Sequence, residues 1–131
     1  MDYSQLSDFE INKLVAKATG TQIEETYQFV NGGEDITDHM SGIVLMRKIT
    51  SNRKHWKLYD PCNNPADAWP MIVDNEISLN SYSGTWEASY EYDAPIGAFG
   101  TDELVTKAVE GKNPLRTAMI AFLMKQEQAN A

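Results

Sequence analysis

Apolar residues near the N-terminus recur at the three- and four-residue spacing of a helix that covers a core. Those on one face are Ile11, Leu14, Val15 and Ala18. Ser7 and Glu10 have the spacing of a capping box, and Gly20 suits the left-handed residue that ends many helices. The pattern predicts a first helix between Ser7 and Gly20.

The next segment changes to short apolar runs separated by polar turns, which is typical of strands. The runs are "TYQFV" (26–30), "GIVLMRKIT" (42–50) and "HWKLY" (55–59), with turns predicted at 31–33 and 51–52. A tight connection between the last two runs predicts an antiparallel pair.

The stretch "DPCNNPADAWP" (60–70) predicts a strand exit followed by a short helix. Asn64 is a good N-cap, and Pro65 suits the first helical position because no hydrogen-bonded N–H is lost there. Pro70 lies farther in and is expected to bend the axis. Trp69, Ile72 and Val73 are expected to face the core.

A hairpin is predicted around Ser83-Gly84, because Trp86, Ala88, Tyr90 and Tyr92 alternate with polar residues. One face of this hairpin is therefore aromatic and the other polar. A glycine-bearing loop follows at 94–100, and "TDELVTKAVEG" (101–111) is interpreted as a short helix.

The last helix, from about 115 to 126, is apolar on more than one stripe. Such a helix is either deeply buried or shared with a partner, so a homo-oligomer formed through it is one possibility. Together these elements predict a single α+β domain over residues 1–131. Its small antiparallel sheet is covered on one face by the N-terminal, middle and C-terminal helices.

The 131-residue chain carries a net charge of −8, which argues against general nucleic-acid binding because DNA and RNA are polyanions. There is no basic, apolar leader and no apolar run long enough to cross a bilayer, so we expect a cytoplasmic protein without membrane contact. Five of the 11 basic residues cluster in one segment: Arg47, Lys48, Arg53, Lys54 and Lys57. They form either a solvated hairpin or a seat for a compact anion.

The side chains that commonly carry catalysis are sparse. His39, His55 and Cys62 have no metal-ligand spacing, and the sequence lacks GxGxxG, GxxxxGK[ST] and GxSxG. We therefore expect no metal and no cofactor. Cys62 is better explained as a small packed residue than as a nucleophile, and no catalytic residues are nominated; an enzyme is the less favoured interpretation.

One group of residues could bind a small polar or nucleotide-like ligand. Amides and a helix N-terminus would meet a phosphate, rings would stack on a base or sugar, and cations would neutralise charge. The candidates are Arg53, Lys54, Lys57, Tyr59, Asn63, Asn64, Trp69, Trp86 and Tyr90. Each also has a plainer structural explanation as a cap, core ring or solvated cation.

Three segments of the chain resemble the NinX family, small proteins encoded in the nin region of lambdoid bacteriophages and in prophages. They are "LSDFEINKLVAKA", "YDPCNNPADAWPMIVDNEISL" and "NPLRTAMIAFLMKQEQANA". The resemblance implies a phage accessory protein made in the host cytoplasm, and it supplies no catalytic residues. Two functions stay open: sequestration of a small ligand such as a host signalling nucleotide, or an effector that binds or inhibits a host protein, possibly as a homodimer.

Overall fold

The computed structural model describes residues 1–27, 43–51 and 56–130. Its α-helices are α1 (Asp8–Thr19), α3 (Pro65–Asp74) and α4 (Pro114–Ala129). Its strands are β1 (Ile23–Tyr27), β2 (Ile43–Arg47), β3 (Lys57–Leu58), β4 (Ser78–Tyr82), β5 (Thr85–Ala94) and β6 (Glu103–Gly111). Two 3-10 turns cover Tyr3–Gln5 and Ala98–Gly100.

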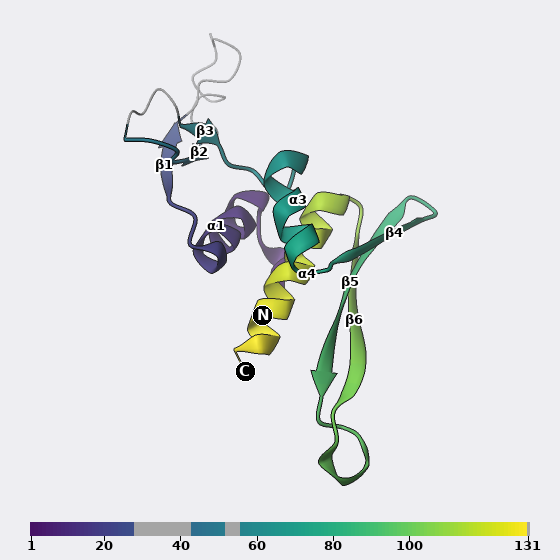
Figure 1. Ribbon diagram of the computed structural model, residues 1–131. Helices are drawn as coiled ribbons and strands as arrows, with labels where there is room; N and C mark the ends of the chain where they lie inside the picture. The colour runs from purple at the N-terminus through teal and green to yellow at the C-terminus, as the bar shows by residue number, and fades with distance from the viewer. Residues whose placement is uncertain (28–42, 52–55, 131) are drawn as a thin grey trace.

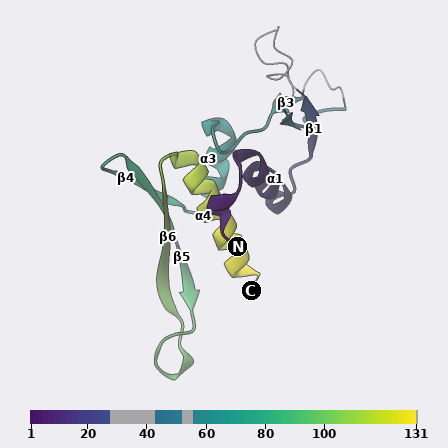
Figure 2. The same ribbon diagram turned by 180° about the vertical axis from the view of Figure 1, so that it is seen from behind.

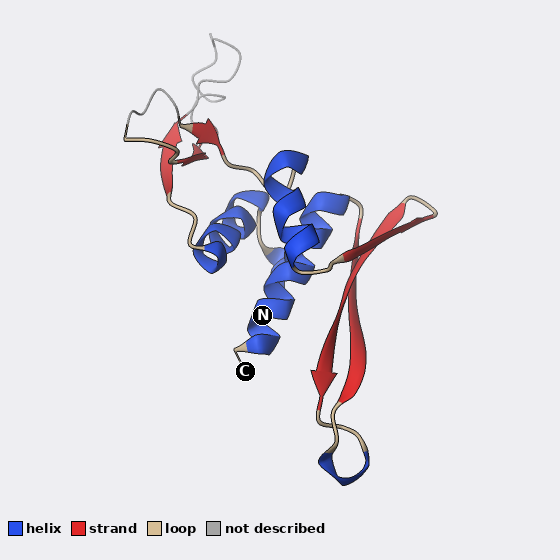
Figure 3. Ribbon diagram, viewed as in Figure 1, coloured by secondary structure: helices blue, strands red, loops and turns tan. Residues whose placement is uncertain are grey.

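The predicted α+β class is confirmed, with the strands divided between two antiparallel sheets. The sheet orders are β1-β2-β3 and β4-β5-β6. The helices gather between the two sheets, as Figure 3 shows. The predicted pairing of the second and third strands is confirmed by Met46 opposite Leu58. The first strand begins earlier than predicted, at Ile23, and the turn at 31–33 lies outside the described residues.

Helix α4 is the centre of the fold, and it packs against α1, α3, β5 and β6 (Figure 1). All seven residues from 117 to 123 are buried, and Met119 is fully enclosed. Asn113 caps the start of this helix, since its side chain accepts hydrogen bonds from two backbone N–H groups of the first turn. Because neighbours within the chain cover this helix on several sides, its apolar stripes need no second copy.

Helix α1 has the predicted ends but a slightly different buried face. The Ser7 side chain accepts a hydrogen bond from the Glu10 N–H, and Gly20 adopts a left-handed φ of 70°. The buried residues include Asn12 and Ala16, whereas Ala18 is exposed. The face is rotated toward Asn12 because that amide is drawn into a buried hydrogen-bond network described below.

Helix α3 also starts as predicted, with the Asn64 side chain accepting from the Ala66 N–H, and it continues through Pro70. The expectation that Trp69 and Val73 face the core is wrong: they are 62 % and 51 % exposed. Ala68 and Ile72 face the core instead. Those two lie one helical turn apart, so Trp69 and Val73 fall on the neighbouring outer stripe.

The β4–β5 hairpin turns at Ser83 and Gly84, both with positive φ, as a tight hairpin turn requires. The aromatic face is confirmed, with Ala88 and Tyr90 buried and Trp86 and Tyr92 partly buried.

The helix expected at 101–111 is wrong, because these residues form β6, paired with β5 from Gly111 opposite Trp86 to Glu103 opposite Ala94. Val105, Val109 and Gly111 are partly buried on β6, whereas its other residues are exposed. Tertiary pairing outweighs the weak helical pattern.

The C-terminal end of α3 contains a residue whose replacement should stabilise the fold. Glu76 follows the helix with a φ of +52°, and the N–H of Ile77 donates to the Ile72 carbonyl at 3.0 Å. This is a Schellman ending in which glycine is the preferred residue. We expect Glu76→Gly to raise the free energy of unfolding by about 0.5–1 kcal/mol, because a left-handed side chain is strained.

Urea denaturation would measure this gain. Glu91→Gly, in the extended strand β5, is the matched control and should lower stability. Equal losses in both variants would contradict the assignment of strain to Glu76.

Candidate functional site

The stretch around Cys62 lies where helices α1, α3 and α4 begin, and it is held by side-chain amides. Asn12 donates from Nδ2 to Asp60 Oδ1 at 2.8 Å and accepts from the Cys62 N–H at 3.0 Å. The Asp60 N–H donates in turn to Asp67 Oδ2 at 2.9 Å. Asn12 thus joins α1 to the turn that leads into α3.

Asn63 and Asn113 extend this network to α4. Asn63 Nδ2 donates to Asp8 Oδ2 at 3.0 Å and to Asp60 Oδ1 at 3.1 Å. Asn113 Nδ2 donates to the Cys62 carbonyl and to Asn63 Oδ1, both at 3.0 Å. Arg116 donates to Asp8 Oδ1 at 2.7 Å and to the Leu6 carbonyl at 2.6 Å. We call this set the polar junction: Asp8, Asn12, Asp60, Asn63, Asn113 and Arg116. Because its members bond chiefly to one another, its first role is architectural.

Cys62 sits inside the polar junction and is fully buried. Burial, followed by the nearby Asp8 and Asp60 carboxylates, raises the pKa of its thiol to about 12. The thiolate is the reactive form of cysteine, so this side chain is a packed residue rather than a nucleophile near neutral pH.

We therefore expect native protein at pH 8 to react very slowly with a thiol reagent such as Ellman's reagent, and to react fully in denaturing urea. The rate of thiol release measures this difference. Fast labelling of the native protein would contradict the burial of Cys62.

On the other side of the molecule, β5 and β6 form a long ribbon that projects past the helices (Figure 1, Figure 2). Strand β4 pairs with β5 only as far as Ser78 opposite Ser89, whereas the β5–β6 pairing continues to Ala94 opposite Glu103. We call residues 90–107 the arm. It is a two-stranded hairpin closed by the loop 95–102.

Large apolar side chains stand exposed at the end of the arm. Ile96 is 66 % exposed, Leu104 is 65 % exposed, and Phe99 has no measurable shielding. We call these three residues the apolar tip. Phe99 has a φ of +61°, a left-handed conformation that is uncommon for a bulky residue and often marks a functional position.

The loop that carries Phe99 is closed by its own hydrogen bonds. The Gly97 N–H donates to the Thr101 carbonyl at 2.9 Å, and the Thr101 hydroxyl donates to the Ala98 carbonyl at 3.0 Å. A Cβ on Gly97 would lie 2.7 Å from the Thr101 carbonyl oxygen, so only glycine permits this close approach. Phe99 is thus presented by a tight turn.

The arm is strongly acidic around its apolar tip. It carries four carboxylates, namely Glu91, Asp93, Asp102 and Glu103, and one ammonium, that of Lys107. Lys107 lies 5.7 Å from the centre of the Tyr92 ring. Within the described residues, none of the four carboxylates makes an ion pair. The apolar tip is therefore flanked by negative charge available to a partner.

A comparison with known protein families matches residues 2–126 to the family described as Bacteriophage P22, NinX. The chain belongs to the NinX family. No curated protein and no solved structure matches it. The match begins before α1, ends within α4 and so includes both the polar junction and the arm of this NinX chain. In the described part of the chain, no helix has the length and apolar character needed to cross a membrane.

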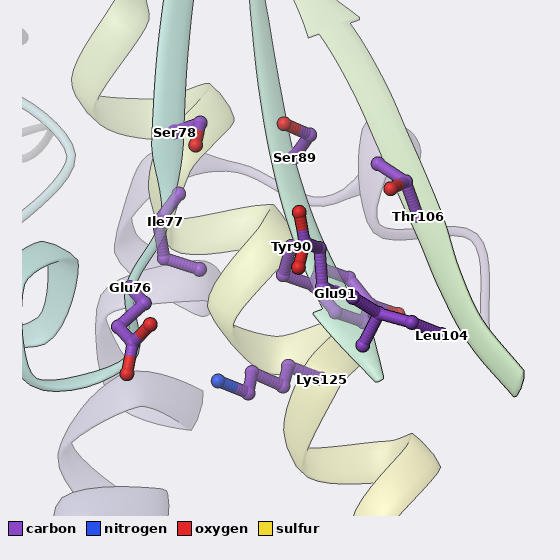
Figure 4. A pocket seen from close by; sticks show the side chains of 9 residues that line it. All are labelled: Glu76, Ile77, Ser78, Ser89, Tyr90, Glu91, Leu104, Thr106 and Lys125. Atoms are coloured by element: carbon purple, nitrogen blue, oxygen red, sulfur yellow. The ribbon is translucent and has the colours of Figure 1, made fainter. Parts of the chain in front are cut away.

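The ligand-binding residues predicted from the sequence are spread over this NinX chain. Tyr59 lines a cavity of about 290 Å³ beside the polar junction, whereas Tyr90 lines one of about 490 Å³ on the other sheet (Figure 4). Trp69 points outward from α3, Trp86 lies on β5, and Lys57 is exposed on β3. Asn63 and Asn64 serve the junction and the α3 cap.

The remaining predicted residues, Arg53 and Lys54, lie outside the described residues, as do His39 and His55. Among the residues that are described, no three His, Cys, Asp or Glu side chains converge as metal ligands would.

Among the predicted ligand-binding residues that the structure describes, Tyr59 is notable for its hydroxyl group. Its hydroxyl is buried and makes no close hydrogen bond within the described residues, although the Thr19 and Thr21 hydroxyls at the end of α1 lie near enough to interact with it. Burial raises its pKa, an effect opposed by the nearby Thr19 and Thr21 hydroxyls. The sequence suggests the Tyr59 ring as a surface on which a ligand could stack. In the structure this ring belongs to the core.

The arm and its apolar tip were missed because 101–111 looked helical. Val105 and Val109 fit a helical spacing and also a strand period. The signal that could have found the tip was the concentration of Ile96, Phe99 and Leu104 in a glycine-bearing segment with several carboxylates.

Proposed function

We propose that this NinX-family protein is a phage accessory protein that acts by binding a host protein through its arm. The observation that carries the proposal is the full exposure of Phe99 at the apolar tip. Burying a phenylalanine side chain in a pocket contributes about 1.5–3 kcal/mol, and aromatic residues are enriched among the few that dominate interface energy.

The geometry of the tip also favours binding over solvation. The loop 95–102 already holds the Phe99 backbone in place by the hydrogen bonds of Gly97 and Thr101. A pre-ordered loop loses less conformational entropy when it binds. The tip can therefore act as a ready-made anchor.

Charge indicates the kind of surface that would receive this anchor. The carboxylates Asp102 and Glu103 lie between Phe99 and Leu104 in the sequence, and Asp93 and Glu91 continue along β5. Complementary charge steers association and rejects wrong partners. The partner is a protein with an apolar pocket rimmed by Lys or Arg.

The test is affinity capture with the tagged protein from phage-infected bacteria, repeated with the variant Phe99→Ser. We expect a discrete protein bound by the wild type, released by moderate salt and absent from the variant. Recovery of the same proteins by both forms, or of none by the wild type, would overturn the proposal.

Capture of a small polar or nucleotide-like ligand is the second candidate, favoured by the cavity of about 290 Å³ that Tyr59 lines with Asp8 and Asn12. Native mass spectrometry of protein purified from infected cells reads this directly. A retained nucleotide-sized mass would support it. An apo mass for the wild type would contradict it.

A further inference from the structure

Strand β5 has two neighbours along its first half and one along its second. Its residues 85–89 pair with β4 on one side, while residues 86–94 pair with β6 on the other. Within the described chain, residues 90–94 therefore have no strand on the β4 side. Every second residue there turns its backbone N–H and C=O toward this open edge.

The edge is open because the chain leaves the line of β4 abruptly. Glu76 takes its left-handed conformation at the end of α3, and Ile77 is buried, so β4 pairs only from Ser78 onward. A cavity of about 490 Å³ lies beside this edge and extends over the face of β5 and β6, where Glu91, Leu104 and Thr106 line it (Figure 4).

The cavity is lined on one side by the segment that leads into β4 and on the other side by β5. Glu76, Ile77 and Ser78 line one side, and Tyr90 and Glu91 of β5 line the other. Lys125 reaches in from α4 toward Glu76 (Figure 4), and its Nζ donates to the Asn75 carbonyl at 2.7 Å.

We propose that an extended segment of a partner protein adds to the β5 edge at residues 90–94, antiparallel to β5 and in line with β4. The inference rests on the proposed function, since it describes how the partner that holds the tip is held along the arm. Extended peptides add to open sheet edges in this way, with backbone hydrogen bonds giving affinity and alternate side chains giving specificity.

The side chains beside the edge indicate the sequence that fits. Glu91 and Asp93 project from one face of β5 without an ion pair among the described residues. Tyr90 and Tyr92 project from the opposite face, with ring centres 6.1 Å apart. A segment in which Lys or Arg alternates with apolar residues would match both faces.

The edge from Tyr90 to Ala94 lacks the lysine, the proline and the bulge that commonly blunt exposed edges, and its charged residues are the acidic Glu91 and Asp93. These carboxylates disfavour pairing with a second copy of the same edge and favour a basic segment. Because a two-stranded hairpin is only marginally stable in water, a third strand would also stiffen the arm that carries Phe99.

Amide hydrogen exchange by NMR tests this inference on the full chain. The probe is a short synthetic peptide of alternating Lys and Val, capped at both ends. We expect it to slow exchange of the edge-facing amides within 90–94 and to leave the amides of α1 unchanged. The same peptide with every backbone nitrogen methylated keeps its charge and side chains but cannot pair as a strand through either edge, so it should give the β5 amides no protection.

The outcomes separate the inference from the proposed function. Protection that persists in Phe99→Ser supports strand addition independently of the apolar tip. Equal effects of the two peptides, or no protection by either, would overturn strand addition. Partner capture that depends on Phe99 would then still stand.

Discussion

A Phe99→Ser variant is expected to bind the captured partner about 30-fold more weakly or worse, because a buried aromatic anchor at an interface typically contributes 2 kcal/mol or more. Folding should be unaffected, since the ring is fully exposed and touches no core residue. Calorimetry with the isolated partner would give the change in Kd, and thermal unfolding would give the stability.

Two further variants isolate the ring and its place. Phe99→Gly removes the ring and the left-handed strain together, so it should lose binding while becoming slightly more stable. Val73→Ser removes an exposed apolar side chain from the outer face of α3 and should bind normally. Loss of binding in Val73→Ser with retention in Phe99→Ser would place the interface on α3 instead.

Asn12→Ala is expected to lower the free energy of unfolding by about 2–4 kcal/mol, the largest stability effect we predict. The buried amide holds Asp60 Oδ1 at 2.8 Å and the Cys62 N–H at 3.0 Å. Its removal leaves the buried Cys62 N–H without a partner, which costs about 1–3 kcal/mol. It also takes from Asp60 Oδ1 one of its two amide donors in the described chain, the other being Asn63 Nδ2.

Chemical denaturation of the purified variant measures this cost. Asn80→Ala, on the exposed strand β4, is the control of the same chemical type and should change stability little. Similar small effects in both variants would show that the polar junction does not hold the three helices together.

Local signals in the sequence predict the helices of this fold well. Ser7, Asn64 and Asn113 each accept the backbone hydrogen bond expected of an N-cap. These interactions span two or three residues, so their physics is contained in the local sequence. The α+β class and the aromatic hairpin follow from equally local periodicities.

The features that could not be predicted from the sequence depend on contacts between distant residues. Strand β6 forms because β5 offers a complementary edge, and the phase of α3 is set by its packing on α4, which turns Trp69 outward. The polar junction joins Asn12 to Cys62 and Cys62 to Asn113, pairs separated by 50 and 51 residues in the sequence. No spacing rule identifies such partners.

The stretch "DPCNNP" is predicted from the sequence as a strand exit and a helix start, and in the structure its side chains join the starts of three helices. The arm depends on a strand pairing that the local pattern did not favour, so its exposed tip could not be placed in advance.

The proposed contact between the apolar tip and a host protein can be tested directly. A photo-crosslinking phenylalanine derivative placed at position 99, and in a second variant at position 73, tests it in infected cells. We expect one discrete protein adduct from position 99 and none from position 73. Adducts from position 73 alone, or none from position 99, would contradict it.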